Sequence, residues 1–175
     1  IHLTMAFIIL GLSFWTAMDL YEGPVKKINL LDKIPIIFIS LTIIAGTFVS
    51  GMDAGLVYNS FPYMGETIVP IEYGSLGIID PFENPVSAQF HHRLLATLTL
   101  VIIILYFINY ILKNEINRRI IVLSIAILCQ FIIGIFTLLY SVPIVLGVIH
   151  QLGGVILFLS SLWLLHFQKG KYSSN

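Results

Sequence analysis

Two histidines stand at matching positions in two apolar segments, and their imidazole side chains could ligate a metal ion. Asn84-Pro85 is typical of a helix cap followed by a proline in the first turn, and His92 follows Pro85 by seven residues. His150 follows Pro143 by the same seven residues. At a helical rise of about 1.5 Å per residue, each imidazole should lie about 10 Å from the start of its helix.

Two neutral imidazoles that face each other at one level can bind both axial positions of a haem iron, and the surrounding aliphatic side chains would form an apolar slot for the porphyrin. Gly153 and Gly154, one turn below His150, would leave room for the flat macrocycle. From the residues alone, two alternatives for His92 and His150 stay open. The pair could bind zinc, or the histidines could have a structural or proton-carrying role.

The residues on either side of His92, His91 and Arg93, are not expected to ligate the metal ion themselves. Arg93 should lie near the outer membrane interface, where its guanidinium would pair either with a haem propionate or with Asp53 or Glu83. His91 points about 100° away from His92 on a helix, so we expect it to face the outer link or the interface.

Three further side chains are candidates that do not join the pair. His2 begins the first apolar segment and could lie at the same outer level, but it has no histidine partner within the bundle. His166 is about 24 Å along its helix from His150, and we expect an interfacial histidine there. Cys129 is the single cysteine, which excludes an intrachain disulfide and cysteine-based metal sites, and we expect it to be a small buried filler.

The composition of the chain is that of an integral, multi-pass membrane protein with lipid as its surroundings. Of 175 residues, 58% are hydrophobic and only 10% are charged, and the mean hydropathy is +0.97. Soluble domains carry about 25% charged residues. The formal net charge is zero, which removes any electrostatic reason to expect a nucleic acid as partner.

The apolar segments predict an all-α, polytopic membrane protein with five transmembrane helices, the last four forming an up-down four-helix bundle. We expect residues 1–21 to be a transmembrane helix that belongs to a missing N-terminal half, residues 22–33 to be an inner loop, and residues 34–175 to be a C-terminal haem-binding bundle. The expected bundle helices cover about 34–52, 85–112, 120–140 and 143–167, with an outer loop at 53–84.

Charges in the connections predict the orientation of the chain. Lysine and arginine occur in the first and third links and in the tail, which should therefore be cytoplasmic or matrix-facing. The long second link has five acidic residues and no lysine or arginine, so it should face outward. The segments at 85–112 and 143–167 then run in the same direction and are diagonal neighbours in the bundle. This places His92 and His150 in the outer half of the membrane.

Several sequence motifs resemble those of haem A synthase. The segment AGTFVSGMDAGLVYNSFP at 45–62, followed by Met64-Gly65-Glu66, is similar to the family's outer-loop signature, in the form found in mitochondria and their bacterial relatives. Later motifs of the family are matched in the same order by ENP at 83–85, QFHHRLL at 89–95 and HQLGG at 150–154.

The resemblance implies a specific activity and set of ligands. Family members have eight helices in two similar halves and oxidise the C8 methyl of haem O to a formyl group, while electrons leave through a b-type haem. On that basis His92 and His150 match the axial ligands of haem b, with Arg93 beside them. His2 matches a histidine of the substrate haem site, whose other histidine and proposed catalytic glutamate belong to the half absent here. The chain alone is therefore expected to be inactive.

The resemblance also implies a location and partners. The location would be a bacterial plasma membrane or a mitochondrial inner membrane, with the haem toward the outer side. Partners would be the substrate haem O, haem O synthase and oxidase-assembly proteins, and homo-oligomerisation stays open. Two departures from the family occur: His91 stands where Asp is usual, and the outer loop lacks the cysteine pair of some bacterial members.

Two other functions remain to be distinguished from the enzyme. One is a non-catalytic b-type cytochrome, an electron-transfer membrane subunit that binds haem without modifying it. The other is a transporter that uses His2, His92 and His150 as a proton path and binds no haem.

Overall fold

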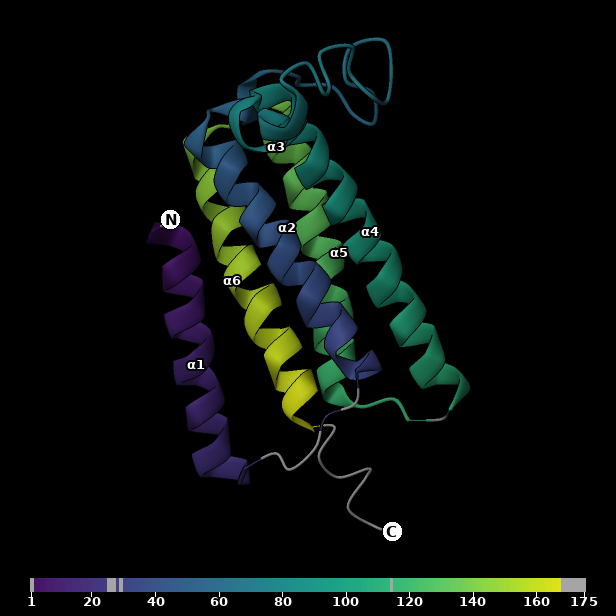
Figure 1. The fold of residues 1–175 in the computed structure, drawn as a ribbon. Coiled ribbons are helices and arrows are strands. Elements are labelled where there is room, and N and C mark those ends of the chain that lie inside the picture. The colour runs from purple at the N-terminus through teal and green to yellow at the C-terminus, as the bar shows by residue number, and fades with distance from the viewer. Residues whose placement is uncertain (1, 25–27, 29, 114, 168–175) are drawn as a thin grey trace.

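The computed structural model of the chain describes residues 2–24, 28, 30–113 and 115–167, and this part is helical (Figure 1). Five helices are long and apolar enough to cross a membrane, as predicted. They are α1 (His2–Glu22), α2 (Ile34–Gly51), α4 (Pro85–Leu112), α5 (Arg118–Leu139) and α6 (Ile144–Phe167). The connections contain the short helices η1 (Leu31–Lys33), η2 (Ala54–Leu56), η3 (Gly77–Ile79) and α3 (Asp80–Glu83).

The ends of the helices follow from local capping. The side-chain oxygen of Asn84 accepts a hydrogen bond from the backbone N–H of Val86, so α4 begins at Pro85 as predicted. Asn117 caps α5 in the same way through the N–H groups of residues 119 and 120, and α5 therefore begins two residues before the predicted start. Four lysines used to predict the orientation, at positions 26, 27, 169 and 171, lie outside the described residues.

Helices α2, α4, α5 and α6 form a ring in which each packs against the next, and α6 closes the ring against α2. Helices α4 and α6 therefore stand at opposite corners, and α1 lies outside the ring against α6 (Figure 1). The core between them is aliphatic and contains Ile39, Ile103, Ile120 and Leu123. Cys129 is exposed on α5, so its predicted burial is wrong: the buried residues of that helix are Ile120, Leu123, Ile127 and Thr137.

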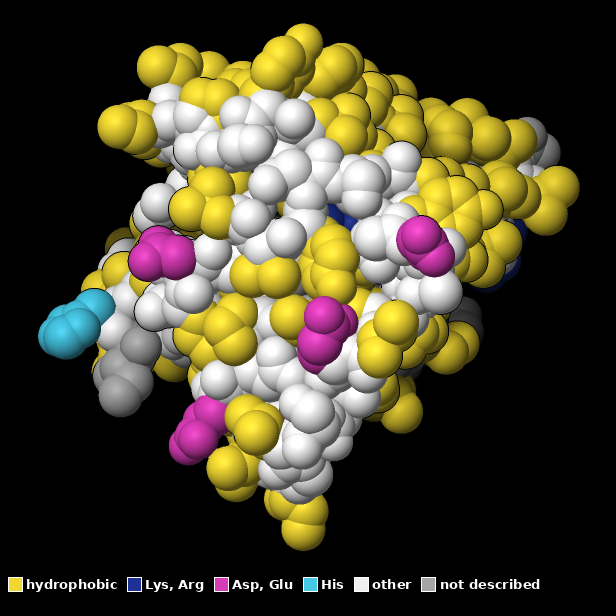
Figure 2. Space-filling view, turned by 90° about the horizontal axis from the view of Figure 1, so that it is seen from above, with side chains coloured by type: hydrophobic (Ala, Val, Ile, Leu, Met, Phe, Trp, Pro, Cys, Tyr) yellow, Lys and Arg dark blue, Asp and Glu magenta, His cyan; other side chains and the backbone are white. Residues whose placement is uncertain are grey.

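The long second link folds over one end of the ring and is fastened to it by side-chain amides. The amide of Asn59 donates to the carbonyl of Leu138 at the end of α5 (3.0 Å), and Gln89 of α4 donates to the carbonyl of Tyr58 (3.0 Å). Acidic side chains stand out on this face and basic ones are scarcely visible (Figure 2). The link is therefore a cap over the end of the bundle that holds the predicted histidine pair.

Asp80 holds residues 74–84 of this cap together through hydrogen bonds to its carboxylate. Its side chain is almost fully buried, at 2% exposure, and its two oxygens accept hydrogen bonds from the backbone N–H groups of Gly74 and Leu76 and from the amide of Asn84. Burial opposes ionisation of this carboxyl group, but the hydrogen bonds outweigh it and hold the pKa of Asp80 below its usual range.

We expect Asp80→Asn to loosen the cap at neutral pH, because the amide has one acceptor oxygen where the carboxylate has two. The pKa of Asp80 is lowered in the folded state, so its stabilising contribution is present above the unfolded-state pKa of about 4 and is lost as the pH falls below it. Limited proteolysis of the link should therefore distinguish the variant from wild type at pH 7 and progressively less toward pH 3. The exposed Glu66→Gln is the control, and equal protection of Asp80→Asn and wild type at pH 7 would contradict the assignment.

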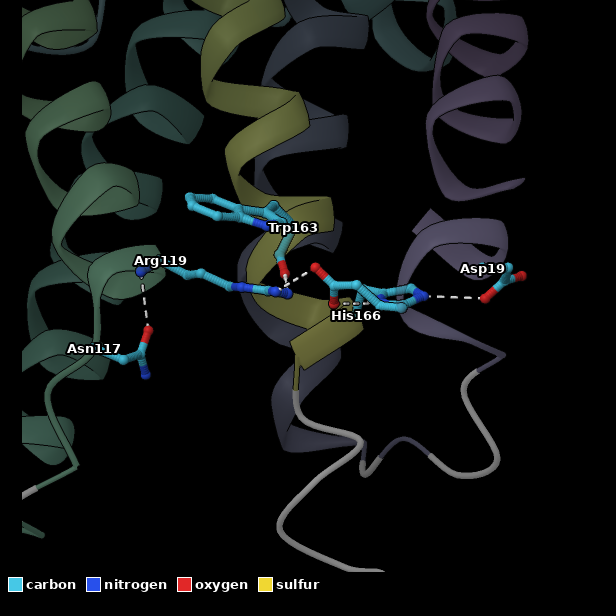
Figure 3. Close-up of polar contacts among 6 residues, drawn as sticks. Asp19, Asn117, Arg119, Trp163 and His166 are labelled. Atoms are coloured by element: carbon cyan, nitrogen blue, oxygen red, sulfur yellow. Dashed lines mark hydrogen bonds and ion pairs between the residues drawn. The ribbon is translucent and has the colours of Figure 1, made fainter. Parts of the chain in front are cut away.

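At the opposite end of the bundle, an ionic cluster fastens α1 to α5 and α6 (Figure 3). The imidazole of His166 on α6 is fully buried and lies 3.0 Å from Asp19 and 3.3 Å from Glu22, both on α1. Arg119 of α5 pairs with Glu22 and donates to the carbonyl of Trp163. The expected interfacial depth of His166 stays a prediction, but its ring is covered by α1, which the sequence did not indicate. The polar end of α1 covers the ring, and each ring nitrogen lies within hydrogen-bond distance of one carboxylate.

We expect His166→Leu to weaken the docking of α1 by about 2 kcal/mol, the usual contribution of a hydrogen bond to a charged group. The measurement is cross-linking by a bismaleimide between Phe7→Cys and Phe158→Cys, which replace two rings that contact each other across α1 and α6, in a Cys129→Ser background. The rate of cross-linking should fall. Thr16→Val removes a hydroxyl that bonds only within α1 and should leave the rate unchanged. An unchanged rate in His166→Leu would show that the cluster does not hold α1.

Candidate functional site

The imidazoles of His92 on α4 and His150 on α6 lie close together within the ring of helices. Their ring centroids are 6.4 Å apart and their planes are almost perpendicular, at 89°. A metal ion bonded to one nitrogen of each ring at about 2 Å, with each nitrogen about 1 Å from its ring centre, would separate the centroids by about 6 Å. The observed separation therefore fits one metal ion between the two rings.

The orientation of His92 is fixed by the neighbouring helix α2. Its Nδ1 lies 3.1 Å from the backbone carbonyl oxygen of Thr42, which can only accept, so Nδ1 carries the proton and Nε2 keeps its lone pair for a metal. Gly46 lies one turn further along α2, where an added Cβ would come within 3.1 Å of the His92 ring. The absence of a side chain at Gly46 therefore makes space for the imidazole.

His150 occupies the matching position on α6 but is held differently. An added Cβ at Gly134 of α5 would come within 2.9 Å of its ring, and the amide of Gln130 donates to its backbone carbonyl at 2.8 Å. The His150 Nδ1 is buried and has no hydrogen-bond partner among the described residues. Gly153 faces the Gln130 side chain, so the space expected here for a macrocycle is occupied by that amide.

Arg93 binds the cap rather than either of the carboxylates expected from the sequence. Its guanidinium donates to the backbone carbonyls of Tyr58 (2.7 Å), Ser60 (2.9 Å) and, more weakly, Tyr63 (3.4 Å). Its Nε is buried without a partner in the part of the chain that the structure describes. A cation that donates to neutral carbonyls still has the charge to attract an anion at this end of the bundle.

The other two predicted side chains lie apart from the pair. His91 accepts or donates a hydrogen bond of 3.2 Å with the hydroxyl of Tyr73, so it faces the cap as its helical position predicts. His2 is exposed at the start of α1, and the structure does not bring it to the pair. Its role as a ligand of a second haem stays a prediction.

The donor set at the pair consists of two neutral imidazoles. Among the described residues, no group of three or more His, Cys, Asp or Glu side chains is arranged to hold a metal ion. Structural zinc sites normally use four protein ligands. Two imidazoles without further protein ligands fit a metal that brings its own equatorial ligands, as the iron of a haem does.

Comparison with known proteins places the chain in a family. Residues 1–162 match the COX15-CtaA family of cytochrome oxidase assembly proteins. The chain belongs to this family. Its COX15-CtaA relatives include the heme A synthase of Pelagibacter ubique, 39% identical over 96% of this chain and 51% of the relative, and that of Rickettsia bellii, 39% identical over 93% of this chain and 52% of the relative.

Human heme A synthase COX15 is 35% identical over 94% of this chain and 43% of its own length. The chain thus spans about half the length of the curated relatives it matches. No solved structure matches it. The resemblance to haem A synthase that the motifs indicated is confirmed by these matches.

Four residues that contact His92 and His150 were not predicted from the sequence. Thr42 and Gly46 lie one turn apart on α2 against His92, and Gln130 and Gly134 lie one turn apart on α5 against His150. Both sets share a pattern, a polar residue followed four positions later by glycine, but Thr47 and Gly51 of α2 match it as well, so the pattern alone does not identify the residues around the pair.

Proposed function

We propose that this chain is the haem-b-carrying part of a haem A synthase and that His92 and His150 are the two axial ligands of the haem iron. The observation that carries the proposal is the 6.4 Å separation of two imidazoles from opposite helices, which suits a single iron between them. The buried, proton-bearing Nδ1 of His92 supports it, because it leaves Nε2 as the free donor.

The proposed reaction of the whole protein is the oxidation of the C8 methyl group of haem O to a formyl group, which produces haem A. A bound haem supplies one-electron transfer, and the protein contributes ligation, orientation and an apolar setting. Here α4 and α6 present the ligands from opposite corners, and the capping link covers the end of the ring. Haem O is then the substrate, with haem O synthase and oxidase-assembly proteins as partners.

Two further assignments belong to this proposal. Arg93 would bind a haem propionate, since it is the residue next to His92 and its guanidinium donates to neutral carbonyls of the cap, which leave its charge uncompensated there. His2, at the exposed start of α1, would ligate the substrate haem together with residues outside this chain. The haem b would lie toward the outer side of the membrane, at the end covered by the acidic link.

The experiment that tests the enzymatic function is expression of the full-length gene in a host that accumulates haem O. We expect haem A to appear in extracted membranes and to be absent when His92→Ala is expressed at the same level. Haem-loaded protein without any haem A would contradict the synthase and favour the non-catalytic b-type cytochrome. A colourless protein would contradict both.

A further inference from the structure

The hydroxyl groups of Thr42 on α2 and Thr99 on α4 form a contact between the two helices, about two helical turns from His92. The hydroxyl oxygens of Thr42 and Thr99 are 2.8 Å apart, and Thr99 is buried at 1% exposure. Carbonyl oxygens also lie within hydrogen-bond distance of the two hydroxyls: that of Phe38 is 2.8 Å from Thr42 and 3.3 Å from Thr99, and that of Leu95 is 2.7 Å from Thr99. Each hydroxyl has one proton, so in the pair one threonine donates to the other while its partner donates to a carbonyl. The two helices are thus fastened by polar contacts in an otherwise aliphatic interface.

This pair involves the same residue whose backbone holds the histidine. Thr42 directs its hydroxyl toward Thr99 and its carbonyl oxygen toward the Nδ1 of His92, so one residue of α2 touches α4 at two levels. Thr99 is seven residues, or about two helical turns, after His92 on α4. A shift of α2 along α4 that broke the threonine pair would also move the carbonyl away from the imidazole.

We propose that Thr99 is a positioning residue for the His92 ligand: by pairing with Thr42, it holds the Thr42 carbonyl on the Nδ1 proton of His92. The inference rests on the proposed haem-binding function. A hydrogen bond from Nδ1–H to a carbonyl makes an imidazole a stronger donor, and partners of this kind commonly change metal affinity by about 10- to 100-fold. Stronger donation favours ferric over ferrous iron.

The two proposed ligands therefore differ in the hydrogen bonding of their Nδ1 atoms. His92 has a carbonyl acceptor for its Nδ1 proton, whereas the Nδ1 of His150 has none among the residues that the structure describes. Thr99 consequently acts on one ligand only, and its removal should weaken the His92 bond while leaving the contacts of His150 with Gly134 and Gln130 in place.

The test compares Thr99→Val, which removes the hydroxyl at nearly constant volume, with Thr99→Ser, which keeps it. The control is Thr97→Val on the same helix, because the Thr97 hydroxyl is exposed and bonds only to Arg93 of its own helix. In the purified haem protein, Thr99→Val should raise the midpoint potential of the haem. A tenfold loss of ferric relative to ferrous affinity corresponds to about 59 mV for one electron. Thr99→Ser should restore the potential, and Thr97→Val should leave it unchanged.

The protonation of His92 gives a second readout that does not need haem. In ¹⁵N-histidine-labelled, haem-free protein, the nitrogen shifts should show Nδ1–H alone in wild type and a mixture of tautomers in Thr99→Val. If Thr99→Val is too unstable to purify, Thr42→Val removes the partner hydroxyl and should give the same two changes.

Two results would overturn the proposal: a potential and tautomer in Thr99→Val equal to those of wild type, or an equal change in Thr97→Val. Failure of the wild-type protein to bind haem would instead overturn the proposed function, while the tautomer measurement would still decide whether Thr99 positions His92.

Discussion

Replacing either His92 or His150 with alanine should abolish the low-spin b-type haem spectrum of the purified protein. Each substitution removes one of the two imidazoles whose rings stand 6.4 Å apart, and a single remaining ligand cannot fill both axial positions of the iron. We expect haem to be lost or left five-coordinate and high-spin. The measurement is the absorption spectrum of oxidised and reduced protein, with the haem content determined per chain.

His91→Ala is the matched control for this prediction. It also removes an imidazole, from the residue next to His92, but His91 faces the cap and bonds to Tyr73. Its spectrum should remain that of wild type. A low-spin spectrum that survives in His92→Ala or His150→Ala, or one that disappears in His91→Ala, would refute the assignment of the axial ligands.

Adding one methyl group beside each proposed ligand should cause a large loss of haem affinity. Gly134→Ala would place a Cβ 2.9 Å from the ring of His150, and Gly46→Ala would place one 3.1 Å from the ring of His92. Both distances are below ordinary van der Waals contact, so the rings must move. We expect at least a tenfold loss of haem affinity in Gly134→Ala, in the range found when a ligand's supporting contacts change, and a smaller loss in Gly46→Ala.

Gly51→Ala distinguishes this steric effect from a general effect of alanine in a helix. Gly51 ends α2, and an added Cβ there meets nothing within 4 Å. Alanine is favoured over glycine inside a helix by about 1 kcal/mol, so this variant should bind haem normally and be as stable as wild type or more so. Haem titration of the three variants decides between the explanations. Normal haem binding by Gly134→Ala would show that the His150 ring is not confined by α5.

The sequence predicted the helices and the level of the histidine pair because both depend on local rules. Long uncharged segments must form helices in a membrane, and Asn84-Pro85 places the start of α4 by capping. Equal seven-residue spacings from Pro85 and Pro143 then put two imidazoles at one depth. The start of α5 was missed by two residues because Asn117, which caps it, precedes the apolar run by three residues.

The immediate surroundings of the pair depend on how the helices are rotated, and this could not be read from the sequence. The membrane helices are apolar on nearly all sides, so their composition does not indicate that Gly46 faces His92 or that Thr42 reaches Thr99. Burial of His166 likewise depends on the lateral packing of α1, whose carboxylates reach the ring from a distant part of the chain.

The most direct test of the central claim counts the histidine nitrogens bound to the iron. Pulsed electron paramagnetic resonance of the ferric b-type haem, in protein labelled with ¹⁵N only at histidine, resolves couplings from directly coordinated imidazoles. Two coordinated ¹⁵N-histidines are expected in wild type, with one of them lost in His150→Ala and one lost in His92→Ala wherever haem is retained. A haem with one or no ¹⁵N-histidine ligand in the wild-type protein would contradict the account.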